Sequence, residues 1–310
     1  MKRRERRFQI GIINHCYQRS VDGGVIFYCY SDYLVWFTTV CVIAGRYSVQ
    51  IIAMSPMPDH AHFTILASSR KDLEGFMGEY SKRFAKVHNK VCHRTGPLFE
   101  SPFGSAPKYG AKKARTNIAY VWNNPVERQL AEKAEDYRWT FLAYATTDHP
   151  FSKKLIIRNA RWPIRKAVKE IKAQYKQGKP MSYCQLQRLY QPLDPEEKQQ
   201  LTDYIISTYN VIDYKAASRF FGSYEEMLLA LHANTGSEYD LNEVFVGKSD
   251  AHYAKMVSVI MREMKLGDIH DILAMDTDTK YAMFLLLRKN TDAMAEQIAA
   301  FLHLPLSKNK

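Results

Sequence analysis

The chain has 310 residues, which is long enough for two domains, because single domains cluster near roughly 100 to 200 residues. With 46% hydrophobic and 25% charged residues, and with no repeat or low-complexity tract, the composition excludes disordered, collagen-like and repeat proteins. The 44 Lys and Arg outnumber the 32 Asp and Glu and give a net charge of +12. This excess favours a polyanionic partner.

Two features set the expected location. The longest apolar run, Tyr33 to Gly45, is shorter than the roughly 20 residues that a membrane-spanning helix needs, so no membrane span and no membrane partner are expected. The basic start MKRRERR is followed by polar residues such as Gln9 and Asn14, which a signal-peptide core would not contain. We therefore expect a cytoplasmic protein.

The five cysteines do not indicate a disulfide framework or a zinc ribbon, because their number is odd and no C-x-x-C pair occurs. His88, Cys92 and His93 lie close together in sequence but lack a fourth ligand, so zinc binding is not expected there. His252 and His270 are interpreted as ordinary helix residues.

The first half alternates strand-like and helix-like segments. Apolar periodicity and turn signals predict, in chain order, a strand over 9–17, a helix over 33–44 capped by Ser31, strands over 47–54 and 60–67, a helix over 71–91, an extended piece over 99–106 and a helix from about residue 111. The order βαββαβ is typical of the ferredoxin-like arrangement, an antiparallel sheet with helices on one face. The predicted class is α+β.

A domain boundary is predicted at the stretch TTDHPFS, residues 146–152, after which no strand alternation recurs. The expected units are 1–148, with the sheet, and 149–310, an all-helical region. Residues 153–179, here called the basic segment, hold ten Lys or Arg and a single acid, Glu170, which is typical either of a helix along phosphates or of a solvated linker. Asp194-Pro195 predicts the start of a helix reaching Tyr209, and Ser223 with Glu226 predicts another. Residues 291–304 fit one more helix of a plain bundle.

The motif Met57-Pro58-Asp59-His60-Ala61-His62-Phe63 could bind a metal. Residues two apart on a strand point to the same side, so His60 and His62 can face one ion while Ala61 turns away. Imidazoles suit divalent metals that also bridge to a phosphate oxygen. The spacing by itself leaves an ordinary pair of strand histidines open.

A second candidate is Tyr120 in the helix after the sheet. Helix positions four apart share a face, so Tyr120 could offer its phenol and Asn124 a carbonyl oxygen as a third metal ligand. A residue before proline is biased away from helical geometry, so Pro125 would end or bend the helix at Asn124.

Five short motifs occur in order within residues 8 to 145: HCYQR, MPDHAHF, GPLFESPF, YVWNNPVERQL and AEDYRW. Together they resemble the HUH single-tyrosine transposases of the insertion sequence 200 type, and among these most the REP-associated tyrosine transposases. The resemblance implies that His60 and His62 are paired ligands of a divalent metal, Mg or Mn, and that Tyr120 is the nucleophile. Asn124 stands where transposing relatives have Gln, and is the expected third ligand.

The implied activity is cleavage and rejoining of single-stranded DNA, at palindromic hairpins, through a 5′-phosphotyrosine intermediate. Such an intermediate conserves the bond energy, and no G-x-x-x-x-G-K-[ST] loop for ATP is found. Residues beside the matched motifs could hold the hairpin: Gln18, Arg19, Lys112, Lys113 and Arg115. Lys2 to Arg7 could form a basic arm, and a homodimer is left open.

Two alternatives remain at this stage. One is a domesticated binder or repressor of DNA hairpins that has lost turnover, although a pure binder has no use for His60, His62 and Tyr120 together. The other is an HUH initiator of replication or plasmid transfer, although the helicase or primase segments common in such proteins are not recognised here.

Overall fold

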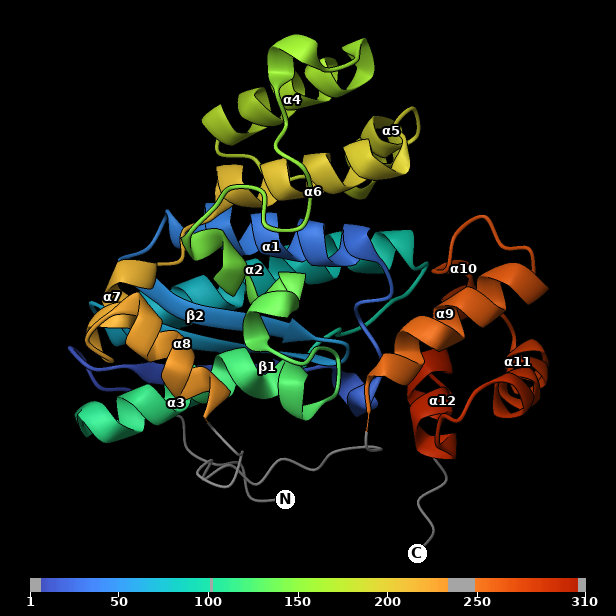
Figure 1. The fold of residues 1–310 in the computed structure, drawn as a ribbon. Coiled ribbons are helices and arrows are strands. Elements are labelled where there is room, and N and C mark those ends of the chain that lie inside the picture. The colour runs from blue at the N-terminus through green and yellow to red at the C-terminus, as the bar shows by residue number, and fades with distance from the viewer. Residues whose placement is uncertain (1–6, 101–102, 234–248, 306–310) are drawn as a thin grey trace, which may run out of the picture.

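A four-stranded antiparallel sheet forms the centre of the N-terminal half (Figure 1). The computed structural model describes residues 7–100, 103–233 and 249–305. The sheet order is β2-β3-β1-β4, the order of a ferredoxin-like fold. Its strands are β1 (Asn14–Arg19), β2 (Val49–Met57), β3 (His60–Ala67) and β4 (Gly104–Pro107). The predicted α+β class and βαββαβ order are confirmed.

Two helices cover one face of the sheet, α1 (Tyr30–Ala44) and α2 (Arg70–Val91). Alternation along β3 turns Phe63 to this face, where its ring lies 5.5 Å from that of Trp36 on α1 and 5.4 Å from that of Tyr80 on α2. The same alternation turns His60 and His62 to the opposite face.

Helix α3 (Gly110–Glu127) lies on that opposite face and contacts β2 and β3. Pro125 is inside the helix, and the Arg128 N–H still bonds to the Asn124 carbonyl. Of the two outcomes expected at the Asn-Pro step, an end or a bend, the helix does not end at Asn124, because tertiary packing overrides the local bias. Asn124 therefore stays on the same helix as Tyr120.

The rest of the described chain is helical, as predicted, and joined by short 3-10 turns. Its helices are α4 (Trp162–Lys176), α5 (Tyr183–Tyr190), α6 (Pro195–Tyr209), α7 (Tyr214–Arg219), α8 (Tyr224–His232), α9 (Ala251–Glu263), α10 (Asp271–Ala274), α11 (Thr277–Asn290) and α12 (Ala295–Leu302). Its 3-10 turns span Ala134–Asp136, Arg138–Thr140, Leu142–Ala145 and Ile157–Asn159, and one more, Val21–Gly23, lies between β1 and α1. No helix within the described ranges is long and apolar enough to cross a membrane.

These helices extend the layers above the sheet. Helix α6 packs on α1, and α4 packs on α6, so that α4 is the layer farthest from α3 (Figure 1). Helix α1 is consequently buried on all sides from Asp32 to Ala44 except at Val42, which explains why that stretch has no polar stripe.

The buried apolar side chains form two clusters. The first joins the sheet and α1–α3 to α4–α8, from Ile13 to Leu231. The second belongs to residues 249–305, here called the C-terminal unit, and includes Val25, Tyr28 and Cys92 from the first half. The division at residue 148 stays a prediction, and the first cluster crosses it.

Candidate active site

The β1–β3 register builds one polar face of the sheet. Tyr17 pairs with His62 and Arg19 pairs with His60. Opposite residues of an antiparallel pair point to the same side, so these four side chains share the face that α3 covers. The two histidine rings lie with centroids 4.8 Å apart.

Tyr120 reaches this face from α3. Its hydroxyl oxygen lies 3.5 Å from His62 Nε2, at the long end of hydrogen-bond range. The helix is held in place from its outer side as well, where Asn123 donates to the Leu231 carbonyl at 2.8 Å. The structure thus brings His60, His62 and Tyr120 together from two elements.

A polar chain continues from His62 into the structure. His15 Nε2 lies 3.2 Å from His62 Nδ1, Asn117 Nδ2 contacts His15 Nδ1, and Thr64 donates to Asn117 Oδ1 at 3.0 Å. Sequence reasoning cited His15 only within a motif and missed Asn117. Its spacing of three residues from Tyr120 on the same helix was the available signal.

This chain determines how His62 faces Tyr120. Burial, followed by the influence of His62 and Lys108, holds the pKa of His15 well below its ordinary value, so His15 is neutral. A neutral imidazole has one donor and one acceptor nitrogen. If the Asn117 amide nitrogen donates to His15 Nδ1, the His15 proton is on Nε2 and is donated to His62 Nδ1, so that His62 Nε2 carries a proton and is a donor toward the phenolic oxygen. If the Asn117 amide is turned round, His62 Nε2 is an acceptor.

His60 is oriented by its own neighbour, since its Nδ1 lies 2.5 Å from Asp59 Oδ1. Burial by itself would raise the pKa of Asp59, but His60, and then Arg19 and Arg128, lower it below its ordinary value. A carboxylate on Nδ1 fixes the tautomer of a histidine that binds metal through Nε2. His62 has a different partner at its Nδ1, the imidazole of His15.

Asn124 lies one turn beyond Tyr120 and is fully buried. Neither its amide nitrogen nor its carbonyl oxygen has a hydrogen-bond partner among the described residues. Leaving such a group unsatisfied costs about 1–3 kcal/mol. The donor set of two imidazoles and an orphaned amide oxygen fits a divalent ion.

The predicted DNA-binding residues do not lie together. Arg19 shares the face of His60, and Lys112, Lys113 and Arg115 are exposed on the first turns of α3. Gln18 points to the other face, where its Oε1 accepts from Tyr80 and Ser81 at 2.7 Å each. Only 7% of Gln18 is exposed, and these two bonds occupy its amide oxygen. Of the expected basic arm, residues 2–6 lie outside the described ranges.

A buried ion pair ties the C-terminal unit to the end of α3. Arg128 Nε and Nη2 donate to the two carboxylate oxygens of Asp250, at 3.0 and 2.7 Å. The Asp250 N–H also donates to the Arg128 carbonyl, at 2.9 Å. The sequence offered no signal for this pair, because its members are 122 positions apart.

Comparisons with known proteins gave one weak likeness. No protein-family model matches the chain, and no curated protein matches it. A solved structure of a REP-associated tyrosine transposase bound to a REP hairpin is similar at 17% identity and a TM-score of 0.41. The match covers 47% of this chain and 87% of that one. At this level of similarity neither activity nor site residues are transferred from that protein.

Proposed function

We propose that this protein is a metal-dependent transposase-type enzyme that cleaves and rejoins single-stranded DNA hairpins, with Tyr120 as nucleophile. The observation that supports this most is the 3.5 Å approach of the Tyr120 hydroxyl to His62 Nε2, beside His60 on the same sheet face. The ordered motifs of the sequence resemblance support the same residues. DNA as substrate agrees with the expected cytoplasmic location.

The proposed reaction is a phosphoryl transfer. The phenolic oxygen of Tyr120 attacks the scissile phosphorus, the bond from phosphorus to the 3′ oxygen breaks, and a 5′-phosphotyrosine forms. The tyrosine proton is lost, and the departing 3′ oxygen gains one. A phenol with a pKa near 10 is a poor nucleophile at neutral pH unless the phosphorus is made more electrophilic. Attack by a 3′ hydroxyl reverses the step.

The proposed ligands of the ion are Nε2 of His60, Nε2 of His62 and Oδ1 of Asn124. When bound, a divalent Mg or Mn ion would orient the phosphate and offset the charge that develops on its oxygens. With the ion bound, His62 Nε2 would be a ligand and its Nδ1–H would donate to His15 Nε2, which requires the Asn117 amide to present its oxygen to His15 Nδ1.

DNA must displace covering side chains to reach this site, because Tyr120 is 2% exposed and His62 is fully buried. This burial favours a second candidate, a binder of DNA hairpins without turnover. Adduct formation separates the two.

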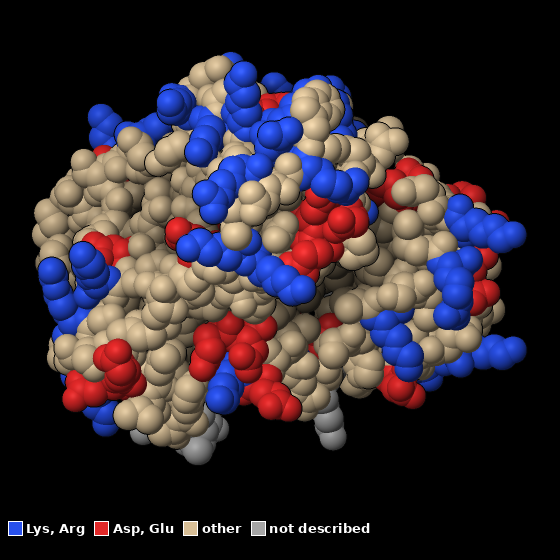
Figure 2. Space-filling model, turned by 45° about the horizontal axis from the view of Figure 1, so that its top comes forward, with Lys and Arg blue, Asp and Glu red and all other residues tan. Residues whose placement is uncertain are grey.

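A second nucleic-acid surface is proposed at the basic segment. All ten of its basic side chains are exposed: Lys153, Lys154, Arg158, Arg161, Arg165, Lys166, Lys169, Lys172, Lys176 and Lys179. Figure 2 shows Lys and Arg gathered over the top of the molecule, where α4 lies. The sheet, α1 and α6 separate this surface from α3. It would therefore hold a different stretch of DNA from the one that Tyr120 attacks.

The test is a denaturing gel with a labelled single-stranded hairpin and Mg or Mn. Wild type should form a protein–DNA adduct that withstands boiling in detergent and disappears with protease, and Tyr120→Phe should bind the hairpin but form none. Tyr109→Phe is the matched control, because Tyr109 is 59% exposed at the start of the same helix. An adduct with Tyr120→Phe would refute the assignment. Hairpin binding by wild type without any adduct would favour the binder.

A further inference from the structure

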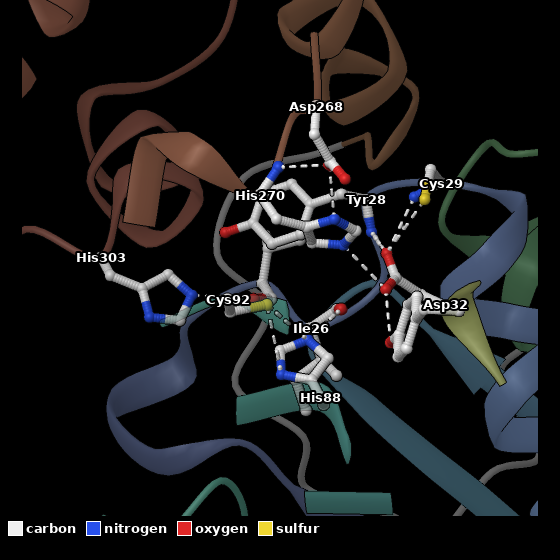
Figure 3. Close-up of polar contacts among 11 residues, drawn as sticks. Ile26, Tyr28, Cys29, Asp32, His88, Cys92, Asp268, His270 and His303 are labelled. Atoms are coloured by element: carbon white, nitrogen blue, oxygen red, sulfur yellow. Dashed lines mark hydrogen bonds and ion pairs between the residues drawn. The ribbon is translucent and has the colours of Figure 1, made fainter. Parts of the chain in front are cut away.

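A second group of potential metal ligands lies where the C-terminal unit meets α1 (Figure 3). Cys29 and Asp32 stand at the start of α1, and His270 directly precedes α10. One ligand atom from each residue lies within 4.8 Å of the others. Asp32 Oδ1 is 2.9 Å from His270 Nε2, and Asp32 Oδ2 is 3.5 Å from Cys29 Sγ.

The donor set has the chemistry of a zinc site. A thiolate with an imidazole selects zinc over Mg or Ca, and a carboxylate is an accepted third ligand. A thiolate and a carboxylate also balance the charge of a divalent ion in a buried place. No other group of three such side chains is this compact within the described residues.

The surroundings of His270 match those of a metal-binding histidine. Its Nδ1 lies 2.6 Å from Asp268 Oδ1, so that Nε2 is the nitrogen directed at Asp32 (Figure 3). A carboxylate on the far nitrogen holds the ring of such a ligand in place. Asp32 is held in turn by the Tyr183 hydroxyl, at 2.7 Å, and by the Tyr28 N–H, at 2.8 Å.

The neighbouring His88 and Cys92 belong to a different contact. His88 Nε2 donates to the Ile26 carbonyl at 3.0 Å, and its ring lies 3.6 Å from Cys92 Sγ. His93 is exposed. The sequence cluster His88, Cys92 and His93 is thus not part of the candidate site.

Solvent can reach the group from outside. Cys29, Asp268 and His270 line a cavity of about 450 Å³, which also has Cys184 in its wall. A zinc ion with three protein ligands takes water as a fourth. The cavity provides room for that water and a path for the ion.

We propose that Cys29, Asp32 and His270 bind one zinc ion, with water from the cavity as fourth ligand, and that this ion fastens the C-terminal unit to α1. The site is separate from that of His60 and His62, and the proposal does not depend on nuclease activity. Since Asp32 and His270 are 238 positions apart in the sequence, the ion would close a long loop of the chain.

Metal content tests the proposal directly. A His60→Ala/His62→Ala variant, which lacks the proposed catalytic ligands, should retain close to one zinc per chain by mass spectrometry of the metal. Adding Cys29→Ser or His270→Gln should remove it. Adding Cys184→Ser should not, because that thiol lines the same cavity without belonging to the ligand set.

Cobalt substitution provides a second readout, because of the two proposed metal sites only the one with Cys29 contributes a thiolate. The chain loaded with Co²⁺ should show a sulfur-to-cobalt charge-transfer band, and Cys29→Ser should abolish it. In the His60→Ala/His62→Ala background, a chelator should lower the melting temperature, and after Cys29→Ser is added it should not. If this background takes up no zinc on dialysis, or keeps one zinc per chain after Cys29→Ser is added, the proposal is overturned and an ion pair of His270 with Asp32 is left.

Discussion

Removing Asp250 should release the C-terminal unit from the end of α3. The side chains of Arg128 and Asp250 are 7% and 1% exposed, and two hydrogen bonds join them. In Asp250→Ala the buried guanidinium would lose these two hydrogen bonds and the carboxylate that makes them, although Asp59 still attracts it. Breaking a buried pair in this way costs about 3–5 kcal/mol, so we expect a loss of that size in the free energy of unfolding.

The pair itself should stabilise the fold little. Burial raises the pKa of Asp250 above its ordinary value even though Arg128 attracts the carboxylate, so the folded state disfavours the ionised form. Replacing both partners by apolar residues, Arg128→Met with Asp250→Leu, should therefore recover the stability or exceed that of wild type by about 1–4 kcal/mol.

Urea unfolding followed by circular dichroism measures both changes, and hydrogen exchange of α9 amides reports whether the C-terminal unit opens first. The matched control is Asp292→Ala, because Lys255 and Asp292 form an exposed pair at 3.3 Å. That variant should lose no more than about 1 kcal/mol. The reasoning is refuted if Asp250→Ala is no less stable than Asp292→Ala, or if the double variant is as unstable as Asp250→Ala.

Two further predictions concern pH and salt. Burial, opposed by the bond that His303 donates to the Val25 carbonyl, lowers the pKa of His303 from 6.5 to about 4. The unfolded chain therefore takes up the proton first, and stability should be complete above pH 6.5 and fall as the pH drops toward 4. Urea unfolding of His303→Asn, which tolerates the left-handed backbone there, should show a smaller fall, and equal falls would contradict this. In the basic segment, Lys166→Gln, Lys169→Gln and Lys172→Gln should each change the binding of single-stranded DNA. Each should reduce the slope of log K, the logarithm of the binding constant, against log salt by about 0.7. An unchanged slope with intact binding would make the segment a linker.

Local signals predicted several elements well. The strand over 60–67 was predicted with its observed bounds, because alternation and the turn before it are both local. Helix α6 begins as expected, since Asp194 accepts from the Glu197 N–H and Pro195 is the first helical residue. Strand β1 starts at Asn14 instead of Gln9, because the Asn14 side chain bonds to Gln9 and closes a turn.

The candidate site was partly accessible to the same reasoning. Strand parity would have separated Gln18 from Arg19, since adjacent strand residues cannot share a face. The pairing of His15 with Asn117 depends on the strand register and on the rotation of α3, which no local pattern contains. His270 was interpreted as an ordinary helix residue, and its contact with Asp32 spans 238 positions.

Because α1 is buried on all sides, its sequence indicates in a related chain whether other helices cover it. From Tyr33 to Ala44 it has no charged residue, because the sheet lies on one side and α6 on the other. A helix with one side in water needs a polar stripe there. A relative that consisted of the sheet alone would therefore have Lys, Glu or Gln on the outer positions of this helix. The polarity of this one stretch would therefore show whether a related chain has helices that cover α1. A gene fragment too short to include α6 would be enough.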